Sequence, residues 1–202
     1  MLLTSRDFSS LVVDALGEQA SEKNIAVACF YFDFAAQKEQ SPADMLGALL
    51  RQVVSGLTEI PGEVVNTYNN HKRVAGGRRP RLPEILKMLQ TVSTLQPIFI
   101  CVDALDECVA EYRQVVLESL QKILEKSPRT RLFITGRSYI RGEIQLLLAE
   151  TVTFMNIKPN ERDVITYILA QLKKDTNKGA MNGSLRGDIL AKVPEMFSEM
   201  YV

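Results

Sequence analysis

The sequence predicts an α/β fold in which a parallel sheet is flanked by helices. Short apolar runs alternate with longer segments of helical periodicity, a pattern typical of successive strand–helix units. The runs at 25–34, 98–102 and 131–135 are the strand candidates, and 151–155 is a further one. Of the 202 residues, 46% are hydrophobic and 24% are charged, which excludes a disordered or fibrous chain.

Helices are expected where capping residues precede apolar stripes. Ser41 can cap a helix whose first position is taken by Pro42 and whose first turn contains Asp44. Asn160 caps another helix, with Asp163 in its first turn. The first helix begins at residue 4 or 5 and places four apolar side chains on one face, namely Leu11, Val12, Ala15 and Leu16. Further helices are expected over 82–92, 111–126, 144–148 and 189–200, and the polar segment 176–187 is expected to be a linker.

Composition excludes several classes of function. The chain has no Cys-x-x-Cys pair and a single histidine, His71, so neither structural zinc nor a disulfide framework is expected. Its 24 Lys and Arg balance 24 Asp and Glu, so the chain as a whole is not attracted to nucleic acid or to an anionic membrane. The longest apolar run, 25–32, is too short to span a bilayer, and Arg6 and Asp7 interrupt any signal peptide. We therefore expect a cytoplasmic protein with no membrane partner.

The segment 72–81 is strongly basic. It contains five Lys or Arg residues together with two glycines and a proline, which indicates a loop. A nucleic-acid contact is one interpretation, but no aromatic residue is interleaved with the charges, as a platform for single strands requires. A solvated loop, or one that touches a neighbouring subunit, is favoured, and no specific nucleic-acid partner is expected.

The strand candidate 98–102 runs directly into an acidic sequence that starts at Asp103. The carboxyl end of a buried parallel strand faces the ligand crevice of an open α/β sheet. Asp103 at this point can hold Mg²⁺ through its water shell beside a nucleoside triphosphate. Glu107, with Asp106 as its neighbour or substitute, is placed to polarise an attacking water. The alternative is an acidic loop that only caps the following helix.

The strand candidate 131–135 ends in Thr135, Gly136 and Arg137. Because parallel strands end at the same edge of a sheet, we expect Thr135 and Arg137 at the same crevice as Asp103. The planar guanidinium of Arg137 suits a γ-phosphate. The alternative is an arginine that pairs with the acids at the neighbouring strand end.

Eight short runs, in order along nearly the whole chain, resemble one family. They are Leu3-Thr4-Ser5, Phe30-Tyr31-Phe32-Asp33-Phe34, Gln40-Ser41-Pro42, Leu49-Leu50-Arg51-Gln52, His71-Lys72, Asp103-Ala104-Leu105-Asp106-Glu107-Cys108, Thr135-Gly136-Arg137 and Met196-Phe197. Together they resemble the NACHT-type ATPases of the signal-transducing STAND class, specifically the nephrocystin-like N-terminal domains of fungal multidomain proteins. The run that starts at Asp103 is highly specific, whereas the others gain force from their order.

The resemblance implies a P-loop NTPase-like fold with ATP and Mg²⁺ as cofactors, and leaves ATP and GTP undistinguished. It implies that Asp103 is the Mg²⁺-associated Walker B acid, Asp106 and Glu107 are the catalytic acids, and Arg137, with Thr135 beside it, senses the nucleotide. Family members usually have Ser in place of Gly136. The resemblance also implies a nucleotide-binding core over 1–158 and the start of a small helical lid over 159–202. Protein partners, or self-association through the core, are expected.

The phosphate-binding loop of that family, Gly-x-x-x-x-Gly-Lys-Ser/Thr, is not found, and the sequence contains no Gly-Lys dipeptide. In the family this loop holds the phosphates and Mg²⁺ through backbone N–H groups, a lysine and a hydroxyl. We therefore expect a truncated or degenerate module of signalling or scaffold type, which lacks the first strand of the sheet and binds nucleotide weakly or not at all. Two alternatives stay open: an active ATPase whose N-terminal segment is absent from this sequence, and a non-enzymatic protein-interaction module.

Overall fold

The computed structural model describes residues 5–23, 25–73, 79–148, 152–156, 160–174 and 182–200. The contacts divide the chain into two compact units, one over Ser5–Thr151 and one that contains Val152–Val202. The sheet and the candidate site belong to the first unit. The expected domain division between residues 158 and 159 stays a prediction.

Three parallel strands form one sheet in the first unit. They are adjacent in chain order: β1 (Ala26–Tyr31), β2 (Ile98–Asp103) and β3 (Thr130–Ile134). The register pairs Tyr31 with Asp103 and Val102 with Ile134, so the three strands end at one edge of the sheet. The central strand, β2, is buried along nearly its whole length. The predicted α/β class with a parallel sheet flanked by helices is confirmed.

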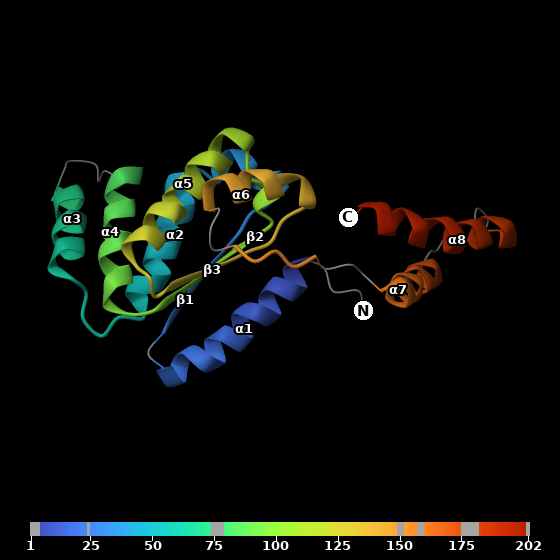
Figure 1. Ribbon diagram of the computed structural model, residues 1–202, viewed down its shortest axis with the longest axis horizontal. Helices are drawn as coiled ribbons and strands as arrows, with labels where there is room; N and C mark the ends of the chain where they lie inside the picture. Colours follow the sequence, from blue (N-terminus) through green and yellow to red (C-terminus); the bar gives the residue numbers. More distant parts are fainter. Residues whose placement is uncertain are drawn as a thin grey trace. The chain divides into compact units, whose positions relative to one another are not determined.

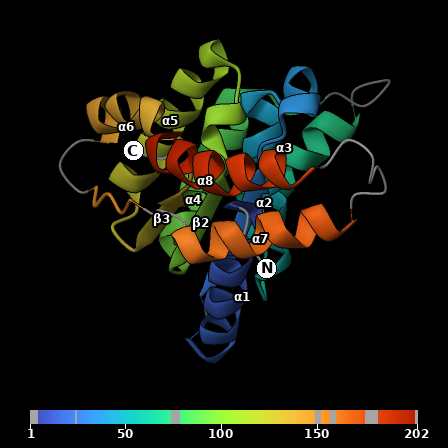
Figure 2. The same ribbon diagram turned by 90° about the vertical axis from the view of Figure 1, so that its right-hand side faces the viewer.

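Helices cover both faces of the sheet (Figure 1). One face is covered by α1 (Ser5–Lys23), and the other by α2 (Pro42–Ser55), α4 (Leu82–Leu95) and α5 (Ala110–Lys126). In both views α6 (Arg141–Leu148) lies beside α5 (Figure 2), and α3 (Gly62–Arg73) packs against α4. Three short 3₁₀ helices follow the strands: η1 (Phe34–Glu39), η2 (Leu105–Glu107) and η3 (Ser138–Ile140).

The second unit, taken by itself, contains α7 (Glu161–Lys174) and α8 (Gly183–Met200), which contact each other. The predicted cap of α7 is confirmed, because Asn160 Oδ1 accepts the N–H of Arg162 at 3.0 Å. That these two helices form a lid stays a prediction. Among the described residues, no helix combines the length and the apolar character that a membrane crossing requires.

Local sequence accounts for α2, which carries much of the core. Ser41 Oγ accepts the N–H of Asp44 at 3.3 Å, and Pro42 occupies the first turn, as predicted. One stripe of this helix is fully buried and packs against β1 and α4; it consists of Met45, Leu46, Leu49 and Val53. Burial of each such side chain contributes about 1.5–3 kcal/mol relative to its exposure.

The outer edge of β1 is closed by two glutamine side chains in place of a fourth strand. Gln52 accepts the N–H of Cys29 at 2.9 Å and donates to the carbonyl of the same residue at 2.8 Å. Gln40 accepts the N–H of Asp33 at 2.9 Å and donates to the carbonyl of Tyr31 at 3.1 Å. Among the described residues, β3 has no strand on its outer side. The edge of β1 is therefore protected by side chains.

Three expectations about helices and loops were wrong. α3 was not predicted, and its last turn contains Lys72 and Arg73, which were expected to start a loop. Glu63 in the first turn and the basic residues in the last turn complement the helix dipole, which favours the helix. Residues 183–187 belong to α8, so the expected linker is helical in this part, while 175–181 lie outside the described residues. Residues 74–78 of the predicted basic loop also lie outside them.

The strand expectations also need correction. Residues 152–156 have no regular secondary structure, so the strand predicted over 151–155 is wrong for its described part. A strand needs a neighbouring strand, and the described part of the sheet contains β1, β2 and β3 without a fourth member. β1 ends at Tyr31, three residues earlier than predicted, because Asp33 accepts the N–H of Ala35 and starts η1.

The apolar face predicted for α1 is only partly buried. Leu11 and Ala15 are exposed, whereas Val12 and Leu16 are half-buried. Ala20 is the one residue of α1 with a described side chain that is fully buried. Periodicity predicted the helix correctly but not the burial of its face.

Candidate functional site

The ends of β2 and β3 bring together two residues that the sequence assigned to a cofactor. The hydroxyl of Thr135, directly after β3, donates to Oδ1 of Asp103 at 2.5 Å and accepts the N–H of Ala104 at 3.0 Å. Asp103 is only 2% exposed. The Thr135 hydroxyl therefore joins the two strand ends and orients the buried carboxylate.

The turn after Asp103 has an unusual backbone. Ala104 adopts the left-handed conformation, with φ 52° and ψ 47°. This conformation costs a residue with a Cβ about 1–2 kcal/mol, so the surrounding contacts must hold it. The buried Leu105 side chain and the hydrogen bond from Leu105 N–H to Thr135 O, at 3.0 Å, anchor the turn. The reversal directs Asp106 and Glu107 away from the strand axis and into η2.

Asp106 pairs with Arg137, the predicted sensor arginine. The Arg137 Nε and Asp106 Oδ2 atoms are 3.3 Å apart, and the arginine side chain is 71% exposed, whereas that of Asp106 is 7% exposed. Gly136, between Thr135 and Arg137, lies so close to Ile140 that a Cβ at this position would be 2.6 Å from Ile140 Cδ1. The glycine therefore allows the chain after β3 to approach η3 closely.

Glu107 has a different partner. Its Oε2 accepts the N–H of Phe34 at 2.9 Å, at the start of η1. The carboxylate thus connects the turn after β2 to the turn after β1, while the ring of Phe34 is exposed. Of the two predicted catalytic acids, Asp106 lies beside Arg137 and Glu107 lies beside Phe34.

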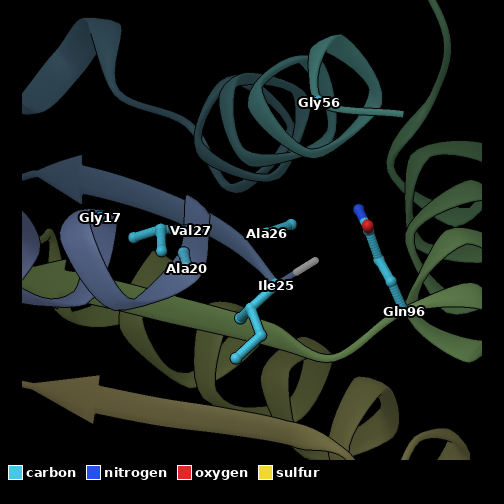
Figure 3. A pocket seen from close by; sticks show the side chains of 7 residues that line it. All are labelled: Gly17, Ala20, Ile25, Ala26, Val27, Gly56 and Gln96. Atoms are coloured by element: carbon cyan, nitrogen blue, oxygen red, sulfur yellow. The ribbon is translucent and has the colours of Figure 1, made fainter. Parts of the chain in front are cut away.

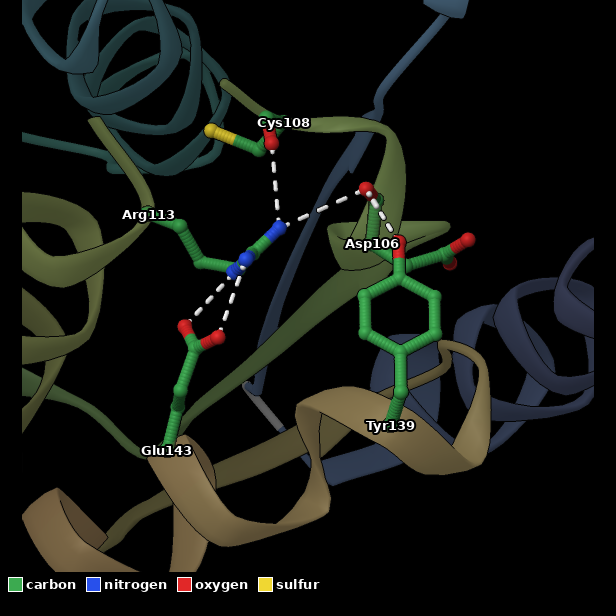
Figure 4. A network of polar contacts seen from close by, with 5 residues as sticks. All are labelled: Asp106, Cys108, Arg113, Tyr139 and Glu143. Atoms are coloured by element: carbon green, nitrogen blue, oxygen red, sulfur yellow. Dashed lines mark hydrogen bonds and ion pairs between the residues drawn. The ribbon is translucent and has the colours of Figure 1, made fainter. Parts of the chain in front are cut away.

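A second arginine, Arg113 of α5, is hydrogen-bonded to backbone carbonyls of the same turn (Figure 4). Its guanidinium makes two hydrogen bonds to the Glu143 carboxylate, at 2.7 and 2.9 Å, and donates to the carbonyls of Cys108 at 3.1 Å and Asp106 at 3.4 Å. The Tyr139 hydroxyl donates to the same Asp106 carbonyl at 3.1 Å. Hydrogen bonding raises the pKa of Arg113 and lowers that of Glu143.

The clamp formed by Arg113 and Glu143 was not predicted from the sequence. Arg113 and Glu143 are 30 residues apart, and each looks like an ordinary charged residue on an amphipathic helix. The only available signal was the position of Arg113 among the buried residues of α5, where a cation requires a partner.

A separate cavity of about 360 Å³ lies at the opposite end of the strands (Figure 3). One polar residue, Gln96, lines it. The other lining residues are small or apolar and lie around the start of β1; they are Gly17, Ala20, Ile25, Ala26, Val27 and Gly56. None of the predicted site residues lines it. The cavity and the candidate site at the strand ends are therefore different places.

The strand-end residues fit Mg²⁺ only in part. The Asp103 carboxylate and the Thr135 hydroxyl are the hard oxygen ligands that this ion prefers. They are hydrogen-bonded to each other, and the described residues contain no group of three His, Cys, Asp or Glu side chains able to hold a metal. A metal at this point depends on further oxygen atoms from water and from a phosphate.

Comparison with known proteins supports one assignment. No curated protein matches the chain, and no solved structure matches it. The family described as "Nephrocystin 3, N-terminal" matches residues 8–137, well over half of the 202 residues. The match includes the three strands, the acidic turn after β2 and Arg137. The chain belongs to the nephrocystin 3 N-terminal family.

Proposed function

We propose that the chain is a degenerate nucleotide-binding module of the NACHT branch of STAND-class P-loop NTPases, which acts as a signalling scaffold and binds nucleotide weakly or not at all. The observation that carries the proposal is the convergence of five polar groups at neighbouring strand ends. Asp103 and Thr135 are hydrogen-bonded to each other, Asp106 is paired with Arg137, and Glu107 is bonded to the turn after β1.

The arrangement is consistent with the roles that the P-loop resemblance assigns. With nucleotide and Mg²⁺ bound, Asp103 and Thr135 would lie on the metal side, and the exposed guanidinium of Arg137 could exchange Asp106 for a γ-phosphate. Glu107 would have to leave the N–H of Phe34 before its carboxylate could orient a water. These residues remain candidates for roles that depend on a bound nucleotide.

Two features support weak binding. The sequence contains no Gly-Lys dipeptide, so it supplies neither the nest of N–H groups nor the lysine that hold the β- and γ-phosphates in this class. In addition, Asp106, Glu107 and Arg137 already have partners within the chain. A nucleotide must therefore compete with internal contacts and lacks its principal anchor.

A scaffold role is favoured by the contrast between the two edges of the sheet. Two glutamines block the edge of β1, whereas no described strand lies beyond β3, whose apolar residues Leu132 and Ile134 are half-buried. A strand edge that no other strand covers is a template for pairing with another chain. The free thiols of all three cysteines suit the reducing cytoplasm.

Isothermal titration of the 202-residue chain with Mg-ATP, and separately with Mg-GTP, tests the proposal. We expect no saturable heat below about 1 mM nucleotide, a concentration that corresponds to at most about 4 kcal/mol of binding free energy. Light scattering without nucleotide is expected to show a species larger than the monomer. Micromolar affinity for either nucleotide would overturn the proposal in favour of an active ATPase, and a strictly monomeric chain would remove the scaffold role.

A further inference from the structure

Two cysteines lie side by side on neighbouring strands of the sheet. Cys29 of β1 and Cys101 of β2 are partners in the parallel register. In-register residues of neighbouring strands are about 4.8 Å apart and project their side chains from the same face. This separation lies within the range of about 4.4–6.8 Å between the Cα atoms of a disulfide.

Electrostatics supports the proximity of the two sulfur atoms. Burial raises the pKa of Cys101 to about 11, and the neighbouring Cys29 contributes in the same direction. The pKa of Tyr31 is raised to about 12, first by burial and then by Cys29 beside it. Cys29, Cys101 and Tyr31 therefore form one cluster. The next pair in register on the same face of the sheet is Tyr31 with Asp103.

The two cysteines differ in accessibility. Cys29 is half-buried, whereas Cys101 is 3% exposed. A reagent from solvent therefore reaches Cys29 first, and Cys101 is the thiol that can respond from within the sheet. The third cysteine, Cys108, is buried beyond the end of β2 and has no register partner.

We propose that Cys29 and Cys101 form an oxidisable dithiol site that reacts with a peroxide and closes into a disulfide between β1 and β2. The Cys29 thiolate attacks one peroxide oxygen, the O–O bond breaks, and Cys29 becomes a sulfenic acid while the other oxygen leaves as water. The Cys101 thiolate then attacks the Cys29 sulfur, the S–O bond breaks, and the oxygen leaves as a second water. Two thiols and one hydrogen peroxide become one disulfide and two waters.

The bond would act on the candidate site through the strands. The side chains start about 4.8 Å apart, slightly more than the Cβ separation of about 3.5–4.5 Å in a disulfide, so β1 and β2 must move together by a few tenths of an ångström. Asp103 lies two residues after Cys101 and Tyr31 two residues after Cys29. The disulfide therefore draws together the strand ends that position Asp103, and it is readily reduced because its closure works against the sheet. This inference does not depend on nucleotide binding.

Treatment of the full chain with hydrogen peroxide, followed by intact mass measurement and peptide mapping, tests the proposal. We expect a loss of about 2 Da, a linked Cys29–Cys101 peptide, and full reversal by a phosphine reductant. Cys29→Ser and Cys101→Ala should each abolish the mass loss, whereas the matched variant Cys108→Ala should retain it.

Other outcomes contradict the proposal. Accumulation of an oxygen-containing product at Cys29 with no linked peptide would mean that Cys101 does not respond. A linked peptide that contains Cys108, or a disulfide between two chains, would place the reactive pair elsewhere. Because mapping of the unmodified sequence gives the answer directly, the test holds even if Cys101→Ala does not fold.

Discussion

Two arginine–carboxylate pairs hold the turn after β2, and they differ in which partner is buried: the arginine in one pair and the carboxylate in the other. The Arg113 side chain is 8% exposed and bonds both a carboxylate and two carbonyls, whereas the Arg137 side chain is 71% exposed and pairs with Asp106 alone. A buried cation bonded to several acceptors is costly to remove, whereas an exposed cation leaves its partner more easily. The inner pair is therefore structural, and the outer pair is the one that a ligand or partner can exchange.

The same contrast separates the backbone of the turn from its side chains. Arg113 and Tyr139 bind the carbonyl of Asp106, while the carboxylate of that residue points toward Arg137. Hydrogen bonds to this carbonyl thus hold the main chain in place, and the nearly buried carboxylate is left to pair with Arg137. A residue can belong to the rigid scaffold through its carbonyl and to the candidate site through its side chain.

The largest effect is expected when the inner pair is broken. Arg113→Ala removes a buried guanidinium and leaves the Cys108 and Asp106 carbonyls without this donor, which we expect to lower the free energy of unfolding by about 3 kcal/mol. Urea denaturation followed by circular dichroism measures this. Gln114→Ala, on the exposed side of the same helix, is the control and should change stability by less than about 0.5 kcal/mol. Equal losses in the two variants would mean that the pair is not a clamp.

A smaller effect is expected from acid. The hydrogen bond from Arg113 lowers the pKa of Glu143 below its ordinary value of 4.5, so the ion pair stabilises the fold above this pH and loses its contribution as the pH falls through the lower, folded-state pKa. The stability difference between the natural chain and Glu143→Gln should therefore be largest near pH 6 and shrink toward pH 3. The pKa of Glu63 and that of Glu84 are lowered as well, so the natural chain alone would report several carboxylates. The difference between the two chains isolates the contribution of Glu143. A pH-independent difference would contradict the assignment.

The smallest effect is expected for the outer pair. Arg137→Ala removes an exposed cation but leaves the nearly buried Asp106 carboxylate without this partner, and we expect the free energy of unfolding to fall by about 1 kcal/mol. Thermal unfolding of this variant beside Arg113→Ala measures the contrast between the two arginines directly. A loss for Arg137→Ala as large as that for Arg113→Ala would show that the outer pair is also structural and not available for exchange.

Local sequence predicted the parts of the fold that depend on neighbouring residues. The Ser41 cap, the buried stripe of α2 and the three strands were expected from spacing alone, because a cap or a stripe involves residues within a few positions of each other. The strand expected over 151–155 was wrong in its described part, since strand formation depends on a neighbour that the local pattern does not reveal. α3 was missed because its sequence is mostly polar.

The candidate site followed the same division. Asp103, Asp106, Glu107, Thr135 and Arg137 were all proposed from their positions at strand ends, and the structure brings them to one edge of the sheet. Their actual partners could not be read from the sequence. Glu107 bonds to a backbone group 73 residues away, and the clamp on the turn joins residues on two different helices.

The amino-acid sequence by itself determined the α/β class, the acidic turn after the central strand and the family to which the chain belongs. Only the tertiary structure decided which arginine is buried, which carboxylate each one meets, and which cysteine lies opposite Cys29. The reason is physical: propensity and periodicity act over a few residues along the chain, whereas ion pairs and register depend on distances in space that the packing of the whole unit establishes.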